Sequence, residues 1–262
     1  MNKLSISNIA WTEEWDQMVY EKMAVLGYQG LEIAPTRIFH ERPYEDLESV
    51  SSWYEDFSKR FVIPSMQSIL YGVSDSIFQD EAQRDRLFSY LCRAVDFAQV
   101  ISCKNLVFGC PRNRNGYEGR REIALDFFHR LGEYAWSHGT VIGMEPVPRS
   151  YNTDFLNTTA ETIAFVREVD SQGFKMNLDV GALLTNGEDL SVIDGNVDII
   201  NHVHISEPGL KPIEERPIHI RLRDLLADYG FDRYVSIEMG KQDDISALIS
   251  CMEYISTIFL DK

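Results

Sequence analysis

Short runs of apolar residues alternate with longer segments of helical periodicity along the whole sequence. The segment 80–98 illustrates the longer kind. Its apolar residues Leu87, Leu91, Ala94 and Ala98 recur three or four positions apart, which predicts an amphipathic helix. The run 174–179 illustrates the shorter kind and is typical of a strand. The chain is therefore predicted to repeat a strand–helix unit.

This pattern predicts eight strands, each followed by a helix. The predicted strands cover residues 3–6, 31–33, 62–68, 105–108, 141–145, 174–179, 199–205 and 234–238. The predicted helices cover residues 12–26, 44–60, 80–98, 120–137, 159–169, a short piece at 190–193, 222–229 and 245–259. Strands that alternate with helices imply a parallel sheet, and eight units in 262 residues favour closure into a barrel. We expect an α/β fold, a single (β/α)₈ TIM-barrel domain over residues 1–262.

Charge and composition narrow the classes of partner. The chain has 25 Lys and Arg against 41 Asp and Glu, so its formal net charge is −16 and nucleic-acid binding is not expected. No apolar run approaches the roughly 18 residues of a membrane span, and none resembles a secretory signal. The four cysteines form no C-x-x-C pair, which favours free thiols in a reducing compartment. We expect a cytoplasmic protein with no membrane partner, and a homo-oligomer is left open.

Four of the predicted strands end in a side chain that can bind a metal ion. These candidate ligands are Glu145, Asp179, His204 and Glu238. Charged groups do not belong inside an apolar barrel unless they are paired or bind a metal. The carboxyl ends of barrel strands converge at one mouth, where barrel enzymes place their chemistry. The four side chains are therefore predicted to meet there.

Alternation along the strands places small residues beneath two of the carboxylates. If Glu145 points inward, so does Gly143, and if Glu238 points inward, so does Ser236. These small residues are expected to leave room for an ion and its water.

Several motifs together resemble the xylose-isomerase-like barrel superfamily of sugar isomerases, epimerases and related enzymes. They are the sequences at 27–32 (GYQGLE), 144–146 (MEP), 178–179 (LD), 202–205 (HVHI) and 236–238 (SIE). The resemblance covers essentially the whole chain. It implies that Glu145, Asp179, His204 and Glu238, separated by 34, 25 and 34 residues, hold one divalent metal ion.

Two positions depart from the pattern of the ketose 3-epimerases in this superfamily. Those enzymes usually carry a substrate-contacting His three residues after the Asp, where this chain has Ala182. They also carry a substrate-contacting Arg six residues after the ligand His, where this chain has Leu210. The departures argue against free-ketose 3-epimerase activity and leave the metal ligands intact.

Further strand-end residues are candidates for substrate binding. Glu32 and Gln67 end the second and third predicted strands, where contact with substrate or with a ligand competes with a surface role. His202 lies on the same face as His204, one layer deeper by about 6.6 Å. It is more typical of a core residue than of a direct ligand.

Loop residues near the predicted mouth are also candidates. Arg112 and Arg114 follow the fourth predicted strand and, with Arg149, could hold a phosphate or carboxylate of the substrate. Glu207 and His219 border the long connection after the seventh predicted strand and could contact substrate. Solvated loop charges and loop packing are the alternatives for these five residues.

The ligand set also indicates the metal and the reaction. Three carboxylates and one imidazole form an oxygen-rich set that suits Mn²⁺ or Mg²⁺, with Zn²⁺ or Co²⁺ as alternatives. The resemblance implies a small-molecule carbohydrate substrate. We expect a metal-dependent isomerase or epimerase of a small sugar, sugar phosphate or related polyol ketone. Its reaction would pass through a metal-stabilised cis-enediolate, with Glu145 and Glu238 as the acid/base pair.

Three alternatives use the same barrel. An inosose-dehydratase-like lyase would expel a β-hydroxyl from the same intermediate. An endonuclease IV-like phosphodiesterase would need several additional His ligands for three zinc ions, and six histidines with a net charge of −16 count against it. A non-catalytic sugar-binding barrel would have no need of two opposed glutamates.

Overall fold

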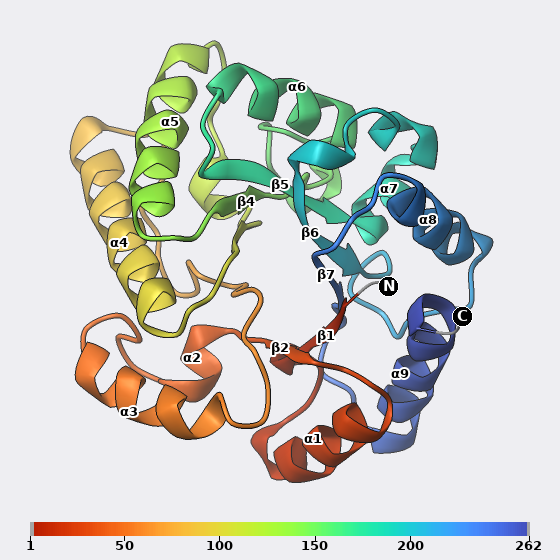
Figure 1. Cartoon of the computed structure of the whole chain (residues 1–262). Helices are drawn as coiled ribbons and strands as arrows, with labels where there is room; N and C mark the ends of the chain where they lie inside the picture. Colours follow the sequence, from red (N-terminus) through yellow and green to blue (C-terminus); the bar gives the residue numbers. More distant parts are fainter. Residues whose placement is uncertain (1–2, 261–262) are drawn as a thin grey trace.

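A curled parallel sheet forms the centre of the computed structural model, which describes residues 3–260 (Figure 1). Its seven strands are β1 (Lys3–Ser7), β2 (Gly30–Glu32), β3 (Leu106–Phe108), β4 (Ile142–Met144), β5 (Phe174–Asp179), β6 (Ile200–Ile205) and β7 (Tyr234–Ile237). They follow the order β2-β1-β7-β6-β5-β4-β3, and the paired strands are parallel.

The segment 62–66 fills the gap between β2 and β3. Val62 forms a parallel bridge with Gly30, and Met66 forms one with Leu106 of β3. The segment was predicted as a strand, but it makes isolated bridges instead. Pro64 has no N–H to donate, which interrupts a continuous ladder. With this segment the strands form the parallel ring of a TIM barrel, which confirms the predicted fold class.

Helices surround the ring in Figure 1. They are α1 (Asp16–Val25), α2 (Pro35–Ile38), α3 (Leu47–Phe57), α4 (Glu81–Val100), α5 (Arg121–Ser137), α6 (Thr159–Val169), α7 (Val180–Asn186), α8 (Pro217–Asp228) and α9 (Ile245–Leu260). Within residues 3–260, no helix combines the length and the apolar character needed to cross a membrane.

Two helices, α7 and α8, differ from the prediction made from the sequence. The helix predicted at 222–229 begins earlier, at Pro217, because a proline is pre-organised for the first helical position. The short helix α7 was not predicted. It starts directly after Asp179, whose side chain accepts a hydrogen bond from the backbone N–H of Ala182 and so caps the helix.

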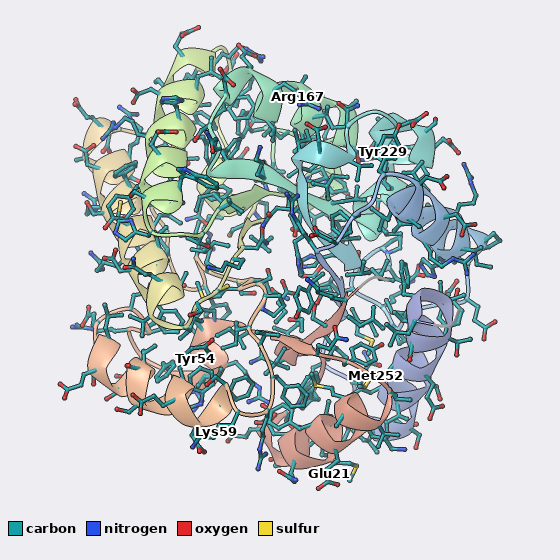
Figure 2. All side chains as sticks on the ribbon, viewed as in Figure 1. Glu21, Tyr54, Lys59, Arg167, Tyr229 and Met252 are labelled. Carbon is teal, nitrogen blue, oxygen red and sulfur yellow. The ribbon has the colours of Figure 1, made fainter. Side chains whose placement is uncertain are left out.

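The core lies between the ring and the helices, where side chains fill the space (Figure 2). The apolar positions that predicted the helix at 80–98 are buried in α4, among them Leu87 and Leu91. Met252 of α9 is likewise buried, whereas Glu21 of α1 and Arg167 of α6 are exposed on the outside (Figure 2). Because one face of each helix is buried against the strands, the carboxyl-terminal ends of the strands are held in fixed positions.

Candidate active site

A cavity of about 290 Å³ opens at the carboxyl ends of the barrel strands. Its wall is built from residues that follow β3 to β7 and the segment 62–66. They include Gln67–Tyr71, Gly109–Pro111, Glu145–Pro148, Ser206–Pro208, Leu210 and Glu238. This is the end of a TIM barrel at which catalytic groups lie.

Four potential metal ligands meet at the floor of this cavity, where three line it and the fourth, His204, is buried directly behind them. One ligand atom from each of Glu145, Asp179, His204 and Glu238 lies within 4.8 Å of the others. The side chains come from the ends of β4, β5, β6 and β7, which are neighbours in that order in the sheet. The two glutamates therefore flank the other two ligands.

Neighbouring groups hold Glu145 in place. Asn177 of β5 donates a hydrogen bond to its Oε1 at 2.7 Å. The buried guanidinium of Arg114 donates to its backbone carbonyl through both terminal nitrogens at 2.8 Å. Gly109 packs so closely that a Cβ at this position would collide with Oε2 of Glu145. These contacts together fix the orientation of the Glu145 carboxylate and the position of its backbone.

Asp179 and Glu238 are also held by hydrogen bonds. Ser206 donates to Oδ2 of Asp179 at 2.6 Å, while the backbone N–H of Ala182 donates to Oδ1. Gln67 donates to Oε1 of Glu238 at 3.0 Å. Both carboxylates are buried, so these donors replace water that the strand ends exclude.

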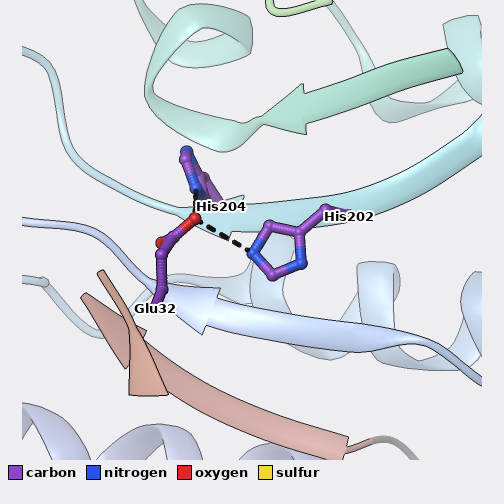
Figure 3. Close-up of side chains that lie close together, drawn as sticks. All are labelled: Glu32, His202 and His204. Atoms are coloured by element: carbon purple, nitrogen blue, oxygen red, sulfur yellow. Dashed lines mark hydrogen bonds and ion pairs between the residues drawn. The ribbon is translucent and has the colours of Figure 1, made fainter. Parts of the chain in front are cut away.

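His204 belongs to a buried polar cluster, and Figure 3 draws it with Glu32 and His202. Its Nδ1 faces the cavity floor, 2.9 Å from Oε1 of Glu145 and 3.2 Å from Oε2 of Glu238. Its Nε2 lies 2.9 Å from Oε1 of Glu32, and Nε2 of His202 lies 3.4 Å from the same oxygen (Figure 3). A carboxylate behind one ring nitrogen fixes which nitrogen faces the ligand set.

The electrostatics of the floor favour a bound cation. Burial, followed by repulsion from Glu145 and Glu238, raises the pKa of Asp179 to about 8. Burial also raises the pKa of Glu238. Burial alone would lower the pKa of His204, but the charges of Glu238 and Glu32 outweigh it and raise that pKa well above its ordinary value. Clustered carboxylates that resist ionisation are stabilised by a positive charge among them.

The donor set fits a divalent cation. It combines carboxylate oxygens from three residues with Nδ1 of one imidazole, all converging on one point. Such sets are typical of hard divalent ions. Glu32, which engages the opposite nitrogen of His204, has a pKa held well below its usual range. Burial alone would raise this pKa, but the combined interactions with His204 and His202 outweigh it.

Two of the six residues that were predicted to contact substrate line the cavity. Gln67 contributes to the wall while it donates to Glu238 and to Ser7. Glu207 also lines the wall, and its carboxylate forms an ion pair with Arg216 at 2.7 Å. Both therefore lie where a substrate could contact them.

The other four predicted substrate contacts do not line the cavity. Glu32 is fully buried beneath it, against His204. His219 is buried in α8 and its Nδ1 lies 3.0 Å from the hydroxyl of Tyr254. Arg114 turns inward, where its terminal N–H groups donate to the carbonyls of Glu145 and Phe108.

Arg112 lies outside the cavity as well. It is exposed and lines a separate surface hollow with Arg120 and Asn152. The two openings share Pro111 and Tyr151 in their walls. Arg149, also exposed, lines neither.

The expectation of free space beneath the carboxylates is wrong. A Cβ at Gly143 would collide with the side chain of Asn105, which fills the space below Glu145. Ser236 donates a hydrogen bond to Oε2 of Glu32 at 3.0 Å, so a second polar group fills the space on the other side. The floor rests on a packed polar layer.

Sequence reasoning missed two residues that support the ligands. Asn177 and Ser206 each lie two positions from a ligand on the same strand or its extension. The period of two along a strand was the available signal, because such neighbours share a face.

Residues 20–254 match a protein family described as "Xylose isomerase-like TIM barrel". No curated protein matches the sequence. Among solved structures, a 3-keto-D-glucoside 4-epimerase from E. coli is 19% identical, with a TM-score of 0.78 over 98% of this chain and 100% of that chain.

Two further structures are similar. D-psicose 3-epimerase from Clostridium cellulolyticum is 16% identical, with a TM-score of 0.81 over 98% of both chains. An AP endonuclease of family 2 from Brucella melitensis is 16% identical, with a TM-score of 0.76 over 95% of this chain and 97% of that chain. At these identities the likeness shows a shared fold, and proteins with that fold carry different activities.

Proposed function

This chain belongs to the xylose isomerase-like TIM barrel family, and we propose that it is a metal-dependent isomerase or epimerase of a small sugar, sugar phosphate or related polyol ketone. The observation that carries this proposal is the cluster of Glu145, Asp179, His204 and Glu238 at the cavity floor. Two glutamates flank the cluster, as a reaction that moves a proton between two positions requires.

One divalent ion, Mn²⁺ or Mg²⁺ before Zn²⁺ or Co²⁺, would be held by these four residues. When bound, it would polarise adjacent carbonyl and hydroxyl oxygens of the substrate and so acidify the C–H between them. The three carboxylates and a dication leave a net charge of −1, from −3 and +2.

Glu145 and Glu238 would exchange the proton with the substrate. One carboxylate takes the proton from carbon, which leaves a cis-enediolate, and the other returns a proton to the opposite face or to the neighbouring carbon. Gln67 and Asn177 keep the two carboxylates oriented through one oxygen each. Pre-organised side chains lose little entropy on reaching the transition state.

Gln67 and Glu207 are the candidate substrate contacts, because both line the cavity. An inosose-dehydratase-like lyase would use the same floor, with loss of a β-hydroxyl from the enediolate. The two reactions differ in whether water is released, so product analysis separates them.

The test is hydrogen exchange at the carbon next to the carbonyl. Protein loaded with Mn²⁺ is incubated in D₂O with a panel of ketoses, ketose phosphates and inososes, and the products are analysed by NMR and mass spectrometry. We expect deuterium at that carbon for at least one compound. Glu145→Gln and Glu238→Gln should each lower turnover at least about a hundredfold while the fold persists.

Binding without exchange for every compound would favour a non-catalytic sugar-binding barrel. Cleavage of abasic duplex DNA would favour a phosphodiesterase, as one structural neighbour is named an AP endonuclease. We propose no nucleic-acid partner, since the chain carries a net charge of −16. The free thiols of all four cysteines fit a cytoplasmic location.

A further inference from the structure

One part of the cavity wall above the ligand cluster is apolar. Ile69, Leu70 and Val147 line it and are buried. Nearer the opening, Tyr71 is 73% exposed and Leu210 is 38% exposed, and both line the same cavity. Large apolar side chains exposed together at the mouth of a pocket mark a surface that a ligand covers.

Tyr71, Tyr151 and Leu210 form an apolar rim at the opening of the cavity. Hydrogen bonds between loops hold Tyr151 and Leu210 in place. The hydroxyl of Tyr151, which is 43% exposed, accepts from the backbone N–H of Gly209 at 3.1 Å. The carbonyl of Leu210 accepts from the N–H of Gly240 at 2.8 Å. Leu210 has a φ of +53°, a left-handed conformation that is costly for a leucine. The loops after β4, β6 and β7 thus present apolar groups at a defined opening.

Charge at the cavity is negative. Its wall includes the carboxylates of Glu145, Asp179, Glu207 and Glu238, and no Lys or Arg of residues 3–260 contributes to it. The nearby cation Arg216 is paired with Glu207. A phosphate dianion would therefore meet net negative charge and no donor that matches it.

We propose that the substrate is an uncharged keto sugar that carries an apolar group at the end remote from its carbonyl, and that it is not a phosphate ester. The inference rests on the proposed function, because it takes the cavity above the ligand cluster as the substrate site. The keto-alcohol end lies at the carboxylate floor. The apolar group lies against Tyr71, Tyr151 and Leu210.

Three compounds that differ only at the remote end test this inference. They are D-fructose, D-fructose 6-phosphate and 6-O-benzyl-D-fructose. Their dissociation constants are measured by titration calorimetry with the full chain loaded with Mn²⁺. We expect the benzyl ether to bind at least about tenfold more tightly than D-fructose, and the phosphate at least about tenfold more weakly. Each tenfold step corresponds to about 1.4 kcal/mol.

Variants locate the contact. Tyr71→Ser combined with Leu210→Asn should remove the preference for the benzyl ether, and asparagine tolerates the left-handed backbone. The matched control combines Trp136→Ser with Ile220→Asn, which changes exposed apolar residues outside the cavity. The control should keep the wild-type preference.

The inference would be overturned by equal affinity for D-fructose and its benzyl ether. It would also be overturned if the preference for the benzyl ether survived in the variant that combines Tyr71→Ser with Leu210→Asn. Tighter binding of the phosphate would likewise overturn it. Loss of that binding in Arg112→Ala would then place the phosphate in the neighbouring hollow. Failure of all three compounds to bind would also overturn it.

Hydrogen exchange with D₂O separates this inference from the proposed function. The predicted order of affinities without exchange supports the ligand class and contradicts the isomerase proposal. Exchange without that order contradicts the ligand class alone.

Discussion

Glu32 is expected to control metal affinity without touching the metal. It is fully buried, and it lies 2.9 Å from Nε2 of His204 and 3.0 Å from the hydroxyl of Ser236, both within hydrogen-bonding distance. Nε2 of His202 lies 3.4 Å away without a hydrogen bond. When Glu32 accepts from Nε2 of the neutral His204 ring, the free lone pair of that ring is on Nδ1, which faces the ligand cluster.

The substitution Glu32→Gln keeps the size of the side chain and removes its charge. His204 and Ser236 engage different oxygens of Glu32, so a glutamine, which has only one oxygen, presents its amide N–H group to one of them. If the amide donates to Nε2 of His204, the ring proton moves to Nδ1 and blocks coordination. Loss of such an outer partner typically lowers metal affinity 10- to 100-fold, which is about 1.4–2.7 kcal/mol.

The assay is competition for Mn²⁺ against a fluorescent chelator, with circular dichroism to verify the fold. Glu207→Gln is the matched control, because Glu207 is also buried but pairs with Arg216. Its affinity for Mn²⁺ should stay within about twofold of wild type. A folded Glu32→Gln variant with wild-type affinity would refute the reasoning. Two bound ions in wild type and one in the variant would instead mean that Glu32 holds an ion itself.

Three further predictions follow from the same geometry. Protein purified without chelator should contain one divalent ion per chain by elemental analysis, and Mn²⁺ at 100 times its Kd should stabilise the fold by about 2.7 kcal/mol; less than about 0.2 equivalents and no stabilisation would count against the site. Arg114→Leu should lower the free energy of unfolding in urea by about 2–3 kcal/mol, since the carbonyls of Glu145 and Phe108 lose the buried guanidinium that donates to them, whereas the exposed Arg112→Leu should change it by less than about 0.5 kcal/mol. Burial lowers the pKa of His219 to about 4, from an ordinary 6.5, so the unfolded chain binds more protons between these values and stability falls as the pH falls. Wild type should therefore lose up to about 1.4 kcal/mol per pH unit relative to His219→Asn across this window, and parallel stability curves would show that His219 has an ordinary pKa.

The order of the strands and helices could be predicted from the sequence because it depends on local periodicity. The apolar spacing in α4 and the alternation in β5 and β7 are properties of a few consecutive residues. The convergence of Glu145, Asp179, His204 and Glu238 also followed, since parallel strands in a barrel end at one face. The positions of these four residues at strand ends were therefore sufficient to predict a candidate site.

Only the tertiary structure decided which side chains meet across the barrel. Glu32 and His204 are 172 positions apart, and their contact depends on how β2 and β6 pack across the interior. Arg114 turns inward and donates to backbone carbonyls at the ends of β3 and β4, a contact that no local pattern encodes. Asn105 fills the space that Gly143 leaves, so a small residue predicted to make room for an ion instead admits a neighbour. Periodicity determines the face on which a side chain lies, but its direction and partners depend on close packing among residues distant in sequence.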